Sequence, residues 1–262
     1  MSSTIPNADV FNWVIGPASQ CVLLVGEETK IASLLQRAVI TLANSGSLLE
    51  LARQQISRAK MPETAIKRLL MEQEGLTSWA KELMSDDFHA INVHGVIGLW
   101  VAVEVAVEDT AVLILMKEPS AVDLIAGTGV RLPNVDGHVP SEADARRIYD
   151  RLERHSRQGR LVIEGYQYLL QTLRVSVVVP NTVALVLSEL NYIRNCLLHR
   201  AGIVDQRVTI EAPDLDARPG EQVKLSSTRY LHYFDAVSQF ALALLKGTIE
   251  SPYVRSRAQR TR

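Results

Sequence analysis

Cysteine is almost absent from this chain of 262 residues, whose only thiols are those of Cys21 and Cys196. Two cysteines so far apart in sequence cannot form a disulfide framework or a Cys-x-x-Cys metal pair. We expect Cys196 to be a small packing residue rather than a nucleophile. No other set of metal ligands is recognisable, so we expect neither a metal ion nor another cofactor.

Aromatic residues and net charge are also scarce. Phe, Trp and Tyr make up 5% of the chain, although 47% of it is hydrophobic. A β-sandwich of this length would carry more aromatic residues, whereas the abundant alanine and leucine favour helices. The formal charge of -1 excludes a polycationic chain. Any contact with nucleic acid must therefore come from a local basic patch.

The chain lacks a long, uninterrupted apolar run as well. Its most apolar stretch, residues 93–116, contains His94, Glu104, Glu108 and Asp109, which a bilayer would tolerate poorly. The N-terminus has no basic segment followed by an apolar core, as a signal peptide would have. We therefore expect a buried core helix, a cytoplasmic protein and no membrane partner.

Apolar residues recur at three- and four-residue steps along most of the chain, which predicts helices. Gly75 separates two of them, Ser141 with Asp144 resembles a capping box, and Gly202 is a natural helix stop. The predicted helices cover 18–44, 47–59, 62–74, a short segment around Trp79, 86–117, 142–158, 160–174, 181–200 and 226–247.

Two β-branched or alternating runs, residues 175–179 and 207–210, predict short extended segments. Because nearly every other pattern is helical, we expect an all-α fold built as a helical bundle. The bundle is predicted to cover residues 85–250. A smaller N-terminal helical region (1–84) precedes it, and a basic tail (251–262) follows.

The predicted helix 181–200 ends in an unusual cluster of polar residues. Asn195 and His199 are four residues apart and share one side of the helix. Arg194 and His199 are five residues apart, roughly 140° around the axis. The arginine must therefore bend towards the imidazole, or a second copy of the helix must complete the site.

These residue types suit phosphate chemistry. Arginine offers a planar, permanently charged fork for two phosphoryl oxygens, and histidine exchanges a proton near neutral pH. Asparagine can orient either group. Cleavage of RNA needs a base for the ribose 2′-hydroxyl and positive charge on the pentavalent transition state. Arg194, Asn195 and His199 could supply both without a metal.

The run from Glu189 to Asp205, which contains Arg194-Asn195-x3-His199 and ends in Gly-Ile-Val-Asp, resembles the signature of HEPN domains. Residues 94–108, with Glu104 and Glu108, are similar to the long first helix of that family, which carries an inward acidic residue. The resemblance covers residues 85–247. It implies a HEPN-like bundle in which two protomers join their motif helices.

The family resemblance also implies a function: a metal-independent endoribonuclease that acts as a homodimer, as a toxin or in defence against phage. Arg194, Asn195 and His199 would be catalytic, with Glu104 and Glu108 in support. RNA is the implied substrate, and an antitoxin or regulatory protein is an implied partner. With the site on a two-fold axis, Tyr192 and Leu198 would lie in the dimer interface.

Several plainer interpretations stay open. Arg194 and His199 could simply favour the helix dipole, and Glu104 and Glu108 could be a solvated stripe. The chain could be a non-catalytic HEPN-like module that binds RNA, a nucleotide or a protein. Basic residues outside the motif are candidate RNA contacts, although the tail arginines could be merely solvated; they are Arg200, Arg255, Arg257, Arg260 and Arg262. His89 and His94 lack metal-ligand spacing and are predicted to be structural.

Overall fold

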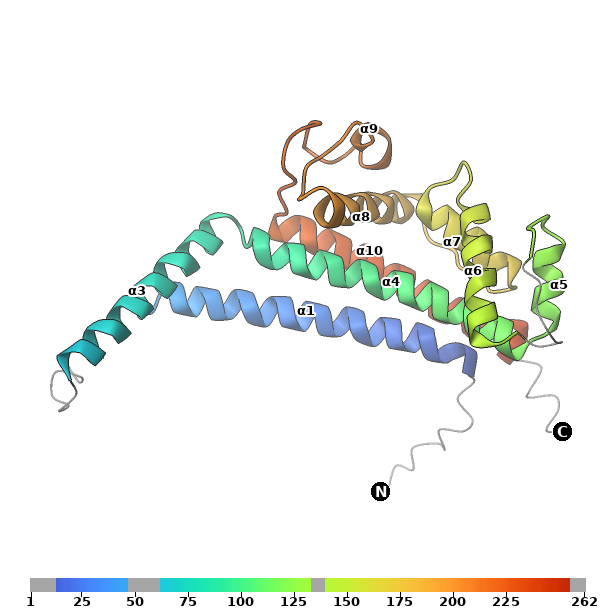
Figure 1. The fold of residues 1–262 in the computed structure, drawn as a ribbon, viewed down its shortest axis with the longest axis horizontal. Helices are drawn as coiled ribbons and strands as arrows, with labels where there is room; N and C mark the ends of the chain where they lie inside the picture. Colours follow the sequence, from blue (N-terminus) through green and yellow to red (C-terminus); the bar gives the residue numbers. More distant parts are fainter. Residues whose placement is uncertain (1–12, 47–61, 133–139, 255–262) are drawn as a thin grey trace, which may run out of the picture. The chain divides into compact units, whose positions relative to one another are not determined.

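The computed structural model describes residues 13–46, 62–132 and 140–254, and it confirms the predicted all-α fold (Figure 1). No strand occurs in these ranges, and a single isolated bridge pairs Ile203 with Gln222. The helices are η2 (Trp13–Ile15), α1 (Gly16–Ala43), α3 (Glu63–Ser85), α4 (His89–Lys117), α5 (Ser120–Ala126), α6 (Glu142–Ser156), α7 (Val162–Thr172), α8 (Asn181–His199), α9 (Val208–Glu211) and α10 (Ser227–Glu250).

Contacts within the described chain divide it into two compact units. One contains residues 13–26, 96–132, 140–223 and 232–254; the other contains 27–46, 62–95 and 224–231. Helices α1, α4 and α10 each contribute to both units. The predicted boundary between residues 84 and 85 stays a prediction.

The first unit is built around α4. Its buried residues Leu99, Trp100, Val103 and Val107 recur at three- and four-residue steps and form one apolar face. Helix α6 packs against α7, α7 against α8, and α8 against α9. The Trp100 ring stacks on Tyr166 of α7 with centroids 6.4 Å apart. This packing holds the helix that carries the HEPN-like motif, α8, in the same core as α4.

Helix α6 shows how its sequence determines its start and its orientation. The Asp144 N–H donates to Ser141 Oγ at 3.2 Å, and the Ser141 N–H donates to Asp144 Oδ2 at 3.3 Å. The predicted capping box is therefore confirmed. Ile148 and Leu152 are buried on one face, whereas most charged side chains of the helix lie on the other. That charged face lines a pocket considered below.

The second unit is held by a buried amide. Asn92 Nδ2 donates to the carbonyls of Asp87 and Leu225, both at 2.9 Å, and its Oδ1 accepts from Gln36 at 3.2 Å. The Leu225 N–H donates to His89 Nδ1 at 3.0 Å. His89 therefore has the structural role predicted for it.

Some local predictions were wrong. Helix α3 runs without a break through Gly75, because one glycine weakens a helix by only about 1 kcal/mol. Residues 208–211 form the single-turn helix α9 rather than a strand, and residues 175–179 do not pair as a strand. The predicted helix 47–59 and the tail residues Arg255, Arg257, Arg260 and Arg262 lie outside the described residues.

None of the described helices is both long enough and apolar enough to cross a bilayer.

Candidate functional site

Helix α8 presents its apolar face to the core and its polar residues at its C-terminal end. Leu187, Leu190 and Ile193 are fully buried, and this stripe fixes the rotation of the helix about its axis. Pro180 is the N-cap residue, and no side chain caps this end. The rotation leaves Arg194 and Asn195 half-buried and His199 exposed.

The end of α8 is defined by Gly202. Its N–H and that of Arg200 both donate to the Cys196 carbonyl, at 2.9 and 3.0 Å. Gly202 has φ +79°, a left-handed conformation that glycine adopts without steric cost. The glycine of the Gly-Ile-Val-Asp run therefore turns the chain back along the helix, as the sequence predicted.

Arg194 reaches α4 and its own neighbour in sequence. Its Nη2 donates to Glu104 Oε2 at 3.0 Å, and its Nη1 donates to Asn195 Oδ1 at 3.0 Å. The two charged side chains are 20% and 30% exposed. Arg194 Nε is buried and has no partner among the described residues. The guanidinium is thus held in place by a carboxylate and an amide, with part of its surface open to solvent.

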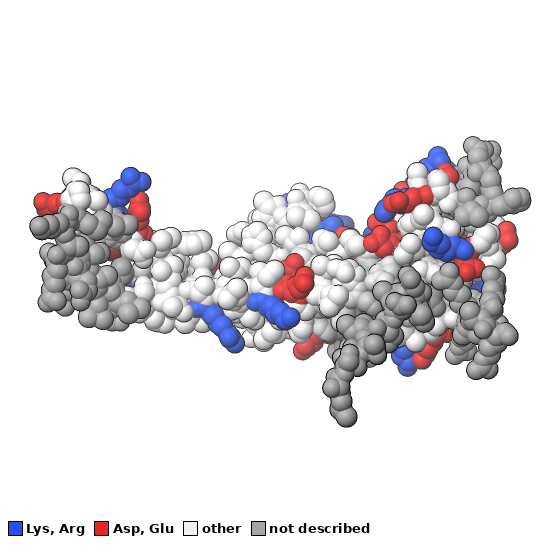
Figure 2. Space-filling view, turned by 90° about the horizontal axis from the view of Figure 1, so that it is seen from below, with Lys and Arg blue, Asp and Glu red and all other residues white. Residues whose placement is uncertain are grey.

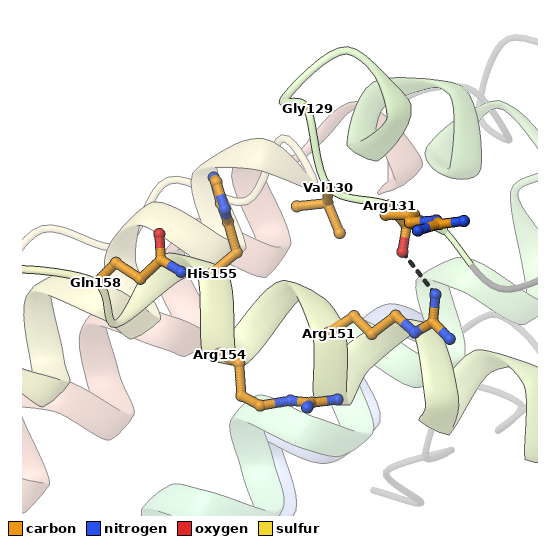
Figure 3. A pocket seen from close by; sticks show the side chains of 7 residues that line it. All are labelled: Gly129, Val130, Arg131, Arg151, Arg154, His155 and Gln158. Atoms are coloured by element: carbon orange, nitrogen blue, oxygen red, sulfur yellow. Dashed lines mark hydrogen bonds between the residues drawn. The ribbon is translucent and has the colours of Figure 1, made fainter.

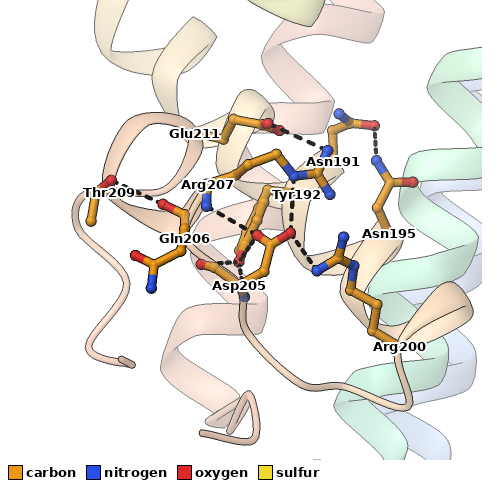
Figure 4. A network of polar contacts seen from close by, with 9 residues as sticks. All are labelled: Asn191, Tyr192, Asn195, Arg200, Asp205, Gln206, Arg207, Thr209 and Glu211. Carbon is orange, nitrogen blue, oxygen red and sulfur yellow. Dashed lines mark hydrogen bonds and ion pairs between the residues drawn. The ribbon is translucent and has the colours of Figure 1, made fainter. Parts of the chain in front are cut away.

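Asn195 links this ion pair to the preceding turn of α8, because its Nδ2 contacts Asn191 Oδ1 at 3.5 Å (Figure 4). His199, one turn further on, makes no hydrogen bond or ion pair with any described residue. One of the two predicted arrangements required Arg194 to bend towards His199. The side chain does not do so. Within one protomer, Arg194 and Asn195 form a fixed pair, and His199 is an accessible imidazole on the next turn of α8.

The second predicted supporting residue is in a different cluster. Glu108 pairs with Arg146 of α6, which also contacts Glu142 at 3.1 Å. Glu104 and Glu108 are therefore paired carboxylates rather than a solvated stripe, and Glu104 alone contacts the motif. Cys196 is fully buried, which agrees with its predicted packing role.

The aspartate that ends the motif run is the centre of a polar network (Figure 4). The Asp205 carboxylate pairs with Arg200 and with Arg207 Nε, the latter at 3.1 Å, and accepts from Tyr192 Oη at 3.1 Å. The Asp205 N–H donates to the same phenol at 2.9 Å. Desolvation opposes ionisation, yet the hydrogen bonds from Arg207 and Tyr192 lower the pKa of Asp205.

This network changes the expected roles of two residues. Arg200, a predicted RNA contact, is tied to Asp205 and anchors the segment after α8, although its side chain is 43% exposed. Tyr192 is fully buried inside the protomer, so its predicted place in a dimer interface was wrong. Leu198 is 48% exposed and remains available for such an interface.

A second polar layer lies near Glu104. Glu153 pairs with Arg157 at 2.7 Å, and Arg157 donates to Tyr166 Oη at 2.9 Å. Desolvation raises the pKa of Glu153; Arg157 opposes this rise, and the negative charge of Glu104 adds to it. Sequence reasoning missed these residues, because their contacts depend on the packing of α4, α6 and α7.

A pocket of about 510 Å³ adjoins the motif helix. Its lining includes Ser188 and Asn191 of α8, Arg157 and Arg160 between α6 and α7, and Glu211 of α9. Asn191 connects this pocket to Asn195. The i, i+4 spacing of the two asparagines was the sequence signal for this connection, and it was overlooked.

In the described part of the chain, no three His, Cys, Asp or Glu side chains gather as a metal site would require. None of the protein-family models, characterised proteins or solved structures compared with the chain matches it. The likeness to HEPN domains therefore rests on the residues of α8, its following turn and α4.

Proposed function

We propose that the chain is an endoribonuclease of the HEPN type. The observation that carries this proposal is the end of α8: an exposed His199, which has no polar partner among the described residues, stands one turn beyond Asn195 and Arg194, which Glu104 holds in place. An accessible imidazole and a fixed guanidinium at one end of a helix are the two kinds of group that metal-independent RNA cleavage uses.

In the proposed reaction, His199 takes the proton from a ribose 2′-hydroxyl. The 2′-oxygen then attacks phosphorus, the bond to the 5′-oxygen breaks, and that oxygen leaves with a proton donated by the partner's His199 in a homodimer. The products are a 2′,3′-cyclic phosphate and a 5′-hydroxyl. Arg194 stabilises the charge on the phosphoryl oxygens, and Asn195 keeps the guanidinium oriented. Glu104 is a positioning residue, because it acts through Arg194.

The proposal includes a homodimer. One protomer supplies a single imidazole, whereas proton removal and donation at one phosphodiester are better served by two. A two-fold axis beside the end of α8 would bring a second His199 and Arg194 to the site, with the exposed Leu198 in the contact. Mass measurement in solution at micromolar concentration tests this, and a strict monomer would contradict it. A toxin or phage-defence role, with an antitoxin or regulatory partner, belongs to the same proposal.

One observation favours a second candidate, a non-catalytic module that binds RNA, a nucleotide or a protein. The Arg194 guanidinium already has two intramolecular partners, Glu104 and Asn195. With both partners inside the chain, the main role of this guanidinium is to join α8 to α4. In this alternative, His199 is a surface residue without chemistry, and its removal leaves every activity of the chain unchanged.

Paired histidine variants separate the two candidates. His199→Ala and His94→Ala each remove an exposed imidazole, but only the first lies at the proposed site. We expect His199→Ala to lower the rate of RNA cleavage by about 10²- to 10⁴-fold and His94→Ala to leave it within about twofold. Expression in bacteria provides a second readout, because toxicity should disappear with His199 only. Full cleavage by His199→Ala would reject the enzyme.

A further inference from the structure

A pocket remote from the α8 motif in sequence carries a strong local positive charge. It has a volume of about 540 Å³ and lies between the charged face of α6 and the segment that follows α5 (Figure 3). Its lining consists of Gly129, Val130, Arg131, Arg151, Arg154, His155 and Gln158. Three arginines and a histidine therefore surround one cavity, and within the described ranges no acidic residue lines it.

The arginines of this pocket lack the carboxylate partners that several other arginines of the described chain have. Arg146, Arg147 and Arg157 all pair with carboxylates. In contrast, Arg151 donates to the Arg131 carbonyl at 2.7 Å, and Arg154 Nε donates to the Asp150 carbonyl at 3.0 Å. Bonds to carbonyl oxygens orient the guanidinium groups without neutralising their charge.

Arg131 completes this arrangement. Its side chain is exposed and has no ion pair with a described residue, while its carbonyl holds Arg151 across the pocket (Figure 3). Most N–H groups of the three guanidinium groups thus remain free for a ligand. An oxyanion with several acceptor oxygens is the ligand that such a set of donors suits best.

We propose that this pocket binds a phosphodiester of the RNA backbone. No Phe, Tyr or Trp among the described residues lines it, and we expect the arginines to contact phosphate, independently of sequence. On the face seen in Figure 2, basic and acidic side chains are interspersed. With a net charge of -1 over the chain, local pockets of this kind must supply the attraction for RNA. The choice of RNA rests on the proposed function; the binding of phosphate does not.

The test measures binding of a fluorescent, single-stranded 2′-O-methyl RNA, which cannot be cleaved through its 2′-oxygen. The pocket variant is Arg131→Gln/Arg154→Gln; both side chains are exposed. The control is Arg68→Gln/Arg147→Gln, with the same loss of charge at arginines that pair with Glu72 and Asp144. Circular dichroism checks that all proteins are folded.

We expect the pocket variant to bind about tenfold more weakly than wild type, with a salt dependence shallower by about 0.7 in log–log slope, because the neutralisation of one phosphate is lost. The control should bind within about twofold of wild type. Equal losses in both variants, or no loss in either, would overturn the proposal. If millimolar inorganic phosphate binds at the pocket while the RNA does not, the site takes a small phosphate and the RNA assignment is wrong.

The same proteins separate this proposal from the enzymatic one. Pocket-dependent binding of the uncleavable RNA, without cleavage of ordinary RNA by wild type, supports the pocket and rejects the nuclease. Cleavage that depends on His199, with RNA binding unaffected by Arg131→Gln/Arg154→Gln, supports the nuclease and rejects the pocket.

Discussion

The ion pair between Arg194 and Glu104 should contribute measurably to stability, because it joins α8 to α4 across the core of one unit. Two unit charges about 4 Å apart attract by about 4 kcal/mol at the effective dielectric constant near a protein surface. The side chains are 20% and 30% exposed, so solvent screening and the loss of hydration offset much of this attraction. We expect a net coupling free energy of about 1 to 2 kcal/mol.

A double-mutant cycle measures this coupling. Arg194→Gln should destabilise the chain by about 2 kcal/mol, because it leaves the Glu104 carboxylate partly buried without its cation. Glu104→Gln should cost about 1 kcal/mol, since its amide oxygen can still accept from the guanidinium. The double variant should then be more stable than the sum of the single effects predicts. Urea denaturation at pH 7 and low salt gives all four unfolding free energies.

The exposed pair of Arg68 and Glu72 on α3 is the matched control, with side chains that are 82% and 55% exposed. Its coupling should not exceed about 0.5 kcal/mol. If Arg194 and Glu104 couple by less than about 0.3 kcal/mol, the contact does not join the two helices in solution. In that case Glu104 could not position the guanidinium, and the role proposed for Glu104 in the mechanism would be rejected.

Three further predictions concern the segments that frame the site. Asp205→Asn should lower the denaturation midpoint at pH 7. Because the folded pKa of Asp205 is lowered by hydrogen bonds that include those from Arg207, this stabilisation is present above the unfolded pKa of about 4 and is lost as the pH falls through the folded pKa. A difference from wild type that does not shrink as the pH falls would count against this assignment. Gly202→Ala should lower the free energy of unfolding by about 1 to 2 kcal/mol, because alanine is strained at this φ of +79°. Steric overlap adds nothing, since an added Cβ would meet only ordinary contacts at 3.6 Å or beyond. An unchanged thermal midpoint would refute this. Ser141→Ala should cost about 1 kcal/mol by removing the hydrogen bond to the Asp144 N–H, and its melting curve should show the loss at neutral pH.

The sequence predicted those parts of the fold that depend on local rules. The period of the apolar residues placed α6, α8 and α10 within a few residues of their observed bounds. Ser141 marked the start of α6, and Gly202 marked the end of α8. The runs at 175–179 and 207–210 suggested strands but do not form them. A β-branched composition cannot indicate whether a neighbouring strand exists to complete a sheet.

The candidate site was predictable in its residue types but not in its contacts. Helical spacing placed Asn195 and His199 on one side of α8. It could not show that Arg194 turns to Glu104, 90 residues earlier in the chain, or that Tyr192 is buried against Asp205. Those contacts follow from the packing of α4 and of the segment after α8, which a periodic pattern does not encode.

Identification of the RNA ends left by the purified protein tests the central claim most directly. With wild type in excess EDTA, we expect cleavage that leaves 2′,3′-cyclic phosphate and 5′-hydroxyl ends, because a ribose oxygen is the nucleophile and His199 and Arg194 supply the chemistry. Cleavage that stops in EDTA, or products that end in a 3′-hydroxyl, would contradict it.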